Sequence, residues 1–174
     1  MKKKFAILAL AGLFFVPALA APEEFSSTTI SIGVVVTDLD KAVDFYTNVV
    51  GMVQTGGFEI GGEFSKKSGL ADGNAAQVKV LRLGQGENAT QWKLMSFGDK
   101  AKPLKNDFIH SHAGMRYITI QVKDLTPVLE RIKARKIKLL GETPVPLGGS
   151  NHFILIQDPD GTFIELIGPM KTTP

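Results

Sequence analysis

The feature that most constrains this fold is a pattern that occurs twice along the chain. Residues 30–39 read ISIGVVVTDL and residues 115–125 read MRYITIQVKDL, so each is a run rich in β-branched residues that ends in Val-x-Asp-Leu. β-branched side chains favour strands, and an aspartate that follows a strand is a good N-cap for a helix. The repeat therefore indicates one supersecondary unit that is built twice.

Each copy of the pattern continues with apolar residues at helical spacing. Residues 39–50 carry apolar side chains every three or four positions, and Gly51 then supplies a helix stop. Residues 125–132 have the same spacing, with Pro127 in the first turn, where a missing N–H costs little. The basic residues over 131–138 are interpreted as the solvated face and C-terminal end of this helix, where cations suit the dipole.

Strand-like segments follow each helix. They lie at residues 52–58, 77–83 and 91–97 in the first half and at 138–140, 152–157 and 162–167 in the second. This order predicts an α+β fold of two βαβββ modules, module one at about 29–98 and module two at about 114–170, with a polar connector at 99–113. Residues 56–74 hold six glycines and few large apolar side chains, so we expect a mobile loop there, and such loops over a cavity can act as lids.

The N-terminus has the three regions of a secretory signal peptide. A basic start at residues 2–4 is followed by an apolar run over 5–16 and by the small-x-small triplet at 18–20. The alternative is a transmembrane anchor, but an apolar run of about a dozen residues is shorter than the roughly 20 that span a bilayer. We expect residues 1–20 to be removed, leaving 21–174 as a single domain in the periplasm or outside the cell.

Removal of this peptide changes the charge balance. The full chain has 20 Lys and Arg against 17 Asp and Glu, and the peptide carries three lysines and no acid, which leaves 17 of each sign. A net charge near zero gives no reason to expect binding to nucleic acid or stable association with an anionic membrane. The chain has no cysteine, so no disulfide framework forms and a metal site would have to use other ligands.

With both modules defined, the chain resembles the vicinal oxygen chelate superfamily of glyoxalase, bleomycin-resistance and dioxygenase-like domains. The opening strand and helix over residues 34–52, VVVTDLDKAVDFYTNVVGM, and the closing hairpin over 158–166, DPDGTFIEL, carry this resemblance. It covers nearly all of residues 21–174. It implies two βαβββ modules with curved mixed sheets around a shared cleft in which a small molecule binds.

The resemblance also implies where a metal would lie, since metal-using members place ligands on the first and last strand of each module. The matching positions here are Ser31, Lys93, Tyr117 and Glu165, and only Glu165 keeps the family's ligand type. Serine and tyrosine are poor ligands for Zn²⁺ or Fe²⁺, and an ammonium group cannot be a ligand. A register shift of two would put Gln91 at the Lys93 position. We therefore expect no cofactor, and a divalent metal is the open alternative.

A buried Glu165 needs a partner, because an unpaired buried charge is costly. Lys93 is the expected counter-charge, with Tyr117 as a hydrogen-bond donor on the facing strand. The alternative is that Lys93 leans into solvent and that hydrogen bonds hold Glu165. A paired Glu165 stays ionised and favours a binding role, whereas an unpaired one becomes a candidate general base.

The histidines lie outside these positions. His152 opens a strand and is a candidate proton shuttle, since imidazole titrates near neutral pH, with a solvated strand end as the alternative. His110 and His112 in the connector are interpreted as solvated loop residues, with a metal site as the alternative. Trp92 alternates with Lys93 and is expected to pack in the core, with a place in the lining of the site as the alternative.

Two main function classes follow from these residues. The first is an exported protein that binds a small molecule in the cleft without a metal, using Ser31, Gln91, Lys93 and Tyr117. The second is a glyoxalase-like lyase, isomerase or epimerase that uses Glu165 as a base, with or without a divalent metal. A third is an interaction module with a collapsed cavity, and a homodimer is compatible with each class.

Overall fold

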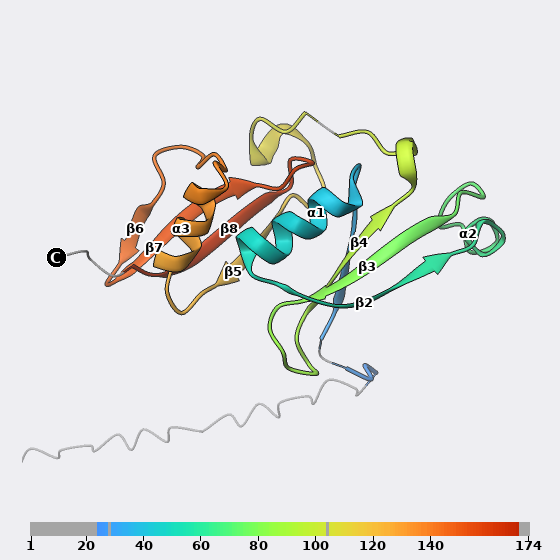
Figure 1. Ribbon diagram of the computed structural model, residues 1–174, viewed down its shortest axis with the longest axis horizontal. Coiled ribbons are helices and arrows are strands. Elements are labelled where there is room, and N and C mark those ends of the chain that lie inside the picture. Colours follow the sequence, from blue (N-terminus) through green and yellow to red (C-terminus); the bar gives the residue numbers. More distant parts are fainter. Residues whose placement is uncertain (1–23, 28, 104, 171–174) are drawn as a thin grey trace, which may run out of the picture.

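The computed structural model describes residues 24–27, 29–103 and 105–170, and it contains two four-stranded mixed sheets with helices against them (Figure 1). The expected signal peptide lies outside these residues. Within the described residues, no helix is long and apolar enough to cross a membrane.

Module one contains four strands and two α-helices, and the first helix ends in a π-helical turn, η1. The elements are β1 (Ser31–Val35), α1 (Leu39–Phe45), η1 (Tyr46–Val50), β2 (Val53–Ile60), α2 (Gly62–Ser68), β3 (Ala76–Arg82) and β4 (Gln91–Ser96). Asp38 caps α1 as predicted, because its carboxylate accepts a hydrogen bond from the Lys41 N–H at 3.0 Å. Gly51 ends η1 with φ 95°, a left-handed conformation that favours glycine.

Module two repeats the plan after two short 3₁₀ turns, η2 (Gly98–Lys100) and η3 (Ile109–Ser111), in and near the connector. Its elements are β5 (Tyr117–Gln121), α3 (Thr126–Ala134), β6 (Val145–Gly148), β7 (Asn151–Gln157) and β8 (Phe163–Pro169). The strand orders are β1-β4-β3-β2 and β5-β8-β7-β6. In each sheet the first strand runs parallel to the last, and the other pairs are antiparallel. The predicted α+β fold of two βαβββ modules is confirmed, and the two sheets do not close into a barrel.

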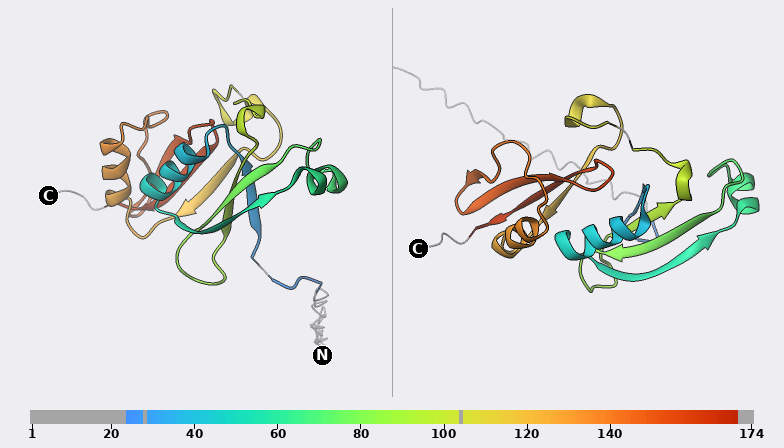
Figure 2. Two further views of the ribbon diagram at one scale, coloured as in Figure 1. Left: turned by 45° about the vertical axis from the view of Figure 1, so that its right-hand side comes forward. Right: turned by 45° about the horizontal axis from the view of Figure 1, so that its top comes forward.

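One hydrophobic core serves both modules. The α1–η1 helix and α3 lie side by side (Figures 1 and 2). Tyr46 and Val49 from η1 belong to the same buried cluster as Ile132 from α3 and Ile164 from β8. Trp92 is 3 % exposed in this cluster, which confirms its predicted place in the core. The shared core explains why the modules form a single unit.

Polar contacts also join the modules, and sequence reasoning did not foresee them. The Tyr46 hydroxyl donates to the Asp158 carboxylate at 2.8 Å, and both residues are buried. The guanidinium of Arg131 donates to the Val49 carbonyl at 3.0 Å, which satisfies a carbonyl at the end of η1. The basic run over 131–138 was interpreted as solvated, and for Arg131 that interpretation was wrong, because its guanidinium bonds to the other module.

Two local predictions were wrong. Residues 56–74 form the end of β2 and helix α2 rather than a mobile loop, and this arm projects from module one (Figure 1). Ser65 holds it together, since its hydroxyl donates to the Ala71 carbonyl at 3.2 Å in a buried position. The strand expected at 138–140 instead lies at 145–148 as β6, although Leu140 still donates a backbone hydrogen bond to Leu155 on β7.

Candidate functional site

The strand pairing fixes which residues of the two modules are equivalent. Gly33 on β1 pairs with Lys93 on β4, and Thr119 on β5 pairs with Glu165 on β8. Gly33 lies five residues before Asp38, and Thr119 lies five residues before Asp124, so the two positions are equivalent. Lys93 is therefore the module-one equivalent of Glu165. Gln91 lies two residues earlier on β4, opposite Ser31. The register is therefore the one on which the Lys93 assignment was based.

Glu165 lies half-buried on β8 and is held by a hydroxyl. Thr119 Oγ1 donates to Glu165 Oε2 at 2.5 Å, from the neighbouring parallel strand. The ion pairs of the described residues do not include one between Lys93 and Glu165. The arrangement matches the alternative in which hydrogen bonds hold Glu165, and the expected counter-charge does not reach it within this chain.

The corresponding face of module one carries a polar pair. Ser31 Oγ donates to Gln91 Oε1 at 3.0 Å, at the exposed start of β1. Successive residues of a strand alternate between faces, and the exposure of β1 follows this rule, with Ser31, Gly33 and Val35 exposed. Lys93 lies beside Gly33 on this same face.

A divalent ion does not fit the residues present at the family's ligand positions. Ser31, Lys93 and Tyr117 supply no carboxylate or imidazole, and Glu165 already accepts a hydrogen bond from Thr119. Among the described residues, no three His, Cys, Asp or Glu side chains gather as a metal site would require. Residues 29–170 thus lack the ligand set of the metal-using members at these positions.

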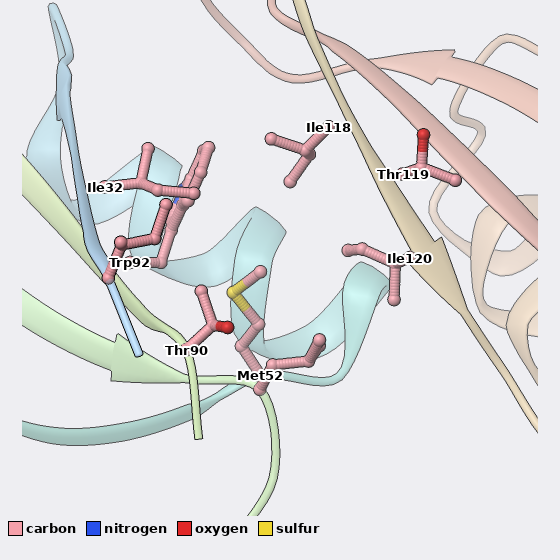
Figure 3. Close-up of a pocket in the computed structure, with 9 residues that line it drawn as sticks. Ile32, Met52, Thr90, Trp92, Ile118, Thr119 and Ile120 are labelled. Carbon is pink, nitrogen blue, oxygen red and sulfur yellow. The ribbon is translucent and has the colours of Figure 1, made fainter. Parts of the chain in front are cut away.

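A cleft lies between the modules, where β1 and β5 approach each other. Its larger pocket has a volume of about 300 Å³ and is lined mainly by apolar side chains (Figure 3). These come from β1, β4 and β5 and from the loops beside them: Ile30, Ile32, Met52, Leu83, Trp92, Ile118 and Ile120, with Thr90 and Thr119. A concave, mostly apolar pocket with a few polar groups is the usual form of a small-molecule site.

A second pocket of about 220 Å³ adjoins the first, since Trp92 and Ile118 line both. Tyr117, 48 % exposed, and Gly33 line this second pocket, so one expected ligand-binding residue borders the cleft. Glu165 is not among the described residues that line either pocket, but it accepts a hydrogen bond from Thr119, which lines the larger one. Lys93 stands beside Gly33, one strand away.

The other expected site residues lie away from this cleft. Ser31 and Gln91 bond to each other at the start of their strands and are not among the described residues that line either pocket. His152 points to the same face of β7 as the buried Ile154, whereas Leu155 and Glu165 point to the opposite face of the sheet. The His152 Nδ1 atom lies 3.0 Å from the Ser150 carbonyl oxygen. The structure therefore does not bring His152 together with Glu165.

The isoleucines that line the pocket were not among the residues predicted for the site. Ile32 and Ile118 sit at the parity of buried neighbours, yet both are only partly buried. Their incomplete burial comes from the gap between the two strands, which is a property of how the modules pack. The strand pattern alone carries no information on that gap.

Comparison with known proteins agrees with this architecture. Residues 29–166 match the family described as Glyoxalase/Bleomycin resistance protein/Dioxygenase superfamily. A probable lactoylglutathione lyase of Vibrio cholerae is 30 % identical over 132 residues, covering 76 % of this chain and 83 % of that protein. One from Vibrio parahaemolyticus is 29 % identical over 133 residues, with the same coverage.

Solved structures share the fold at low sequence identity. A glyoxalase family protein from Bacillus cereus superposes with a TM-score of 0.69 at 18 % identity, covering 87 % of this chain and 99 % of that one. The trypanothione-dependent glyoxalase I of Leishmania major gives a TM-score of 0.58 at 20 % identity, covering 82 % and 87 %. The fosfomycin resistance protein FosX from Listeria monocytogenes, solved with Mn(II) and sulfate, gives 0.52 at 16 %, covering 83 % and 93 %. With its two βαβββ modules and this family match over residues 29–166, the chain belongs to the Glyoxalase/Bleomycin resistance protein/Dioxygenase superfamily.

Proposed function

We propose that this protein binds a small, largely apolar molecule in the cleft between its modules, without a metal ion. The main support is the contrast between the residues that line the cleft and the residues at the family's metal-binding positions. The cleft has an apolar lining around Trp92, whereas the positions that hold the metal in other members carry Ser31, Lys93 and Tyr117. A pocket with this lining gains affinity from burying apolar surface, at about 25 cal/mol per Å².

The polar end of the ligand is proposed to lie over Gly33. A Cβ atom placed on Gly33 would meet no atom within 4 Å, so there is open space above this residue. Lys93 lies on the neighbouring strand of the same face, and Tyr117 lines the same pocket. An acceptor group of the ligand in this space would meet an ammonium group from one module and a phenol from the other.

Trp92 offers a direct test, because it is the chain's one tryptophan and lines both pockets. Bromobenzene is a suitable probe, since it is apolar and its halogen quenches tryptophan fluorescence on contact. We expect saturable quenching that Thr90→Phe abolishes by filling the larger pocket. Thr55→Phe, on an exposed position of β2, is the matched control and should leave the titration unchanged. Quenching that is linear with probe concentration, or equal in both variants, would contradict the proposal.

The proposed location is the periplasm or the medium, and the support is the tripartite N-terminus at residues 1–20. The balanced charge of residues 21–174 supports the further proposal that neither nucleic acid nor a membrane is a stable partner.

A homodimer is the proposed assembly, supported by sheets that stay open and leave Val35 50 % and Phe58 48 % exposed. Light scattering that gives a monomer mass would contradict the dimer.

A second candidate is a lyase, isomerase or epimerase with Glu165 as general base. The observation that favours it is that Thr119, which donates a hydrogen bond to the Glu165 carboxylate, also lines the cleft. The relatives named probable lactoylglutathione lyase give the reaction to assay. Formation of lactoylglutathione that is lost in Glu165→Gln and retained in Glu63→Gln, a change on α2, would replace the binding proposal by this one.

A further inference from the structure

Module two has its own pocket, separate from the inter-module cleft. It has a volume of about 550 Å³ and lies between the connector and the segment that precedes β6. Its apolar lining includes Leu140, Leu155 and Phe163, and its other walls carry Phe108, His110 and Lys138. No lining residue of this pocket lines either cleft pocket.

The connector wall of this pocket is held in place. Gln157 Nε2 donates to the Asn106 carbonyl at 2.7 Å, and Asn106 Nδ2 donates to the Gly161 carbonyl at 3.2 Å. The Phe108 N–H donates to Ser111 Oγ at 3.0 Å, which closes the short turn behind the wall. A wall fixed in this way needs little ordering when a ligand binds, and this lowers the entropic cost of binding.

An aromatic pair forms part of the same wall. The rings of Phe108 and His110 are stacked, with centroids 5.5 Å apart and planes 7° from parallel. Phe108 is nevertheless 63 % exposed, so it does not serve the protein core. An exposed ring fixed beside an apolar pocket is a surface on which a planar aromatic molecule can pack.

The pocket also carries the positive charge of Lys138, which no Asp or Glu in the described part of the chain pairs with. The acid in the lining, Asp107, is engaged by Lys105 at 3.4 Å. The ammonium group therefore favours an anionic group on whatever occupies the pocket.

We propose that this pocket is a second small-molecule site and that it takes planar aromatic carboxylates. The ring packs against Phe108 and over the apolar lining, and the carboxylate meets the Lys138 ammonium group. The site goes beyond the proposed function of the cleft and does not depend on it, because the two share no residues.

Calorimetric titration with 2-naphthoate and with its neutral analogue 2-naphthamide tests this proposal on the full mature chain. Naphthoate should bind more tightly. Lys138→Met should weaken naphthoate by up to about fivefold, the upper range for an exposed charge pair, and should leave naphthamide unchanged. Lys133→Met, an exposed lysine of α3 outside the pocket, is the matched control. Phe108→Ala should weaken both compounds.

Several outcomes would overturn the proposal. They are equal affinity for the two compounds, no effect of Lys138→Met, or no binding at all. A change of oligomeric mass in Phe108→Ala without a change in naphthoate affinity would show that the exposed ring serves a protein contact instead. Because Trp92 does not line this pocket, naphthoate should also leave the bromobenzene titration unaltered, so failure here and failure of the cleft proposal are distinguishable.

Discussion

The buried hydrogen bond between Tyr46 and Asp158 should be a principal polar contribution to the docking of the two modules. The hydroxyl and the carboxylate oxygen are 2.8 Å apart, and the residues are 0 % and 5 % exposed. Tyr46→Phe removes this donor and leaves the carboxylate with the backbone N–H groups of Asp160 and Thr162. Leaving a buried group short of one partner costs about 1–3 kcal/mol, so the free energy of unfolding should fall by that amount.

The loss should depend on pH. Burial raises the pKa of Asp158 above its ordinary value, and the hydrogen bond from Tyr46 opposes that rise. Burial likewise raises the pKa of Tyr46, so its hydroxyl remains a donor at neutral pH. Without the bond, the pKa of Asp158 rises further. A raised folded-state pKa gives stability that is present below the unfolded-state pKa and is lost as pH rises through the folded-state pKa. The cost of Tyr46→Phe should therefore be small in acid and grow toward neutral pH.

Urea denaturation of a protein comprising residues 21–174 at several pH values measures this cost. Tyr117→Phe is the matched control, since its ring is 48 % exposed, and it should change stability by no more than about 0.5 kcal/mol. In an Asp158→Asn background the cost of Tyr46→Phe should shrink, because no buried charge is left short of a donor. An equal cost in both backgrounds, or a cost independent of pH, would refute this reasoning.

Three further predictions concern separate parts of the chain. Gly62→Ala should destabilise by about 1–3 kcal/mol, since its Cβ would lie 2.4 Å from a backbone oxygen; Gly61→Ala has open space and should be nearly neutral in the same denaturation assay. Asp44 has a pKa lowered by hydrogen bonding to Asn48, against a smaller opposing effect of burial, and by Arg135. Asp44→Asn should therefore cost a few tenths of a kcal/mol at neutral pH, and acid melts should show this difference vanish as pH falls through that lowered pKa. N-terminal sequencing of the exported form should begin near residue 21, and a start at residue 1 or 2 would contradict export with cleavage.

The fold was predictable because its information is local and is repeated. Two β-branched runs that end in Val-x-Asp-Leu, each followed by helical spacing, define the two modules without any long-range contact. Asp38 caps α1 and Gly51 ends η1, as the sequence predicted. Predictions of this kind depend on dihedral preferences and caps, which tertiary packing rarely reverses at such strong signals.

The α2 arm was missed because glycine content was taken as a sign of mobility. Gly57 and Gly62 are needed there for close packing instead: a Cβ would lie 2.6 Å from the Val78 carbonyl oxygen in the first case and 2.4 Å from the Gly73 carbonyl oxygen in the second. Glycines that allow two backbones to approach look, in a sequence, the same as glycines that loosen a loop. The strand expected at 138–140 was wrong because two leucines after a lysine do not show whether the segment pairs fully with a neighbouring strand.

The candidate site was predictable only in part. Matching to the family's first strands put Tyr117 at the position that borders the cleft. Strand alternation put Trp92 in the buried cluster, and Trp92 also lines both cleft pockets. It could not show that Glu165 is held by Thr119 rather than by Lys93, because that depends on how the modules are oriented. Contacts such as Tyr46–Asp158 join residues 112 positions apart, and no local pattern announces them.

Metal-independent binding in the cleft is tested most directly by the bromobenzene titration of Trp92 fluorescence, run on one preparation before and after exhaustive dialysis against EDTA. The residues at the family's ligand positions predict saturable quenching with the same dissociation constant in both samples. Elemental analysis should find no stoichiometric transition metal before dialysis. Quenching that disappears after EDTA and returns on addition of Mn²⁺ or Zn²⁺ would contradict the account and place a functional metal in this cleft.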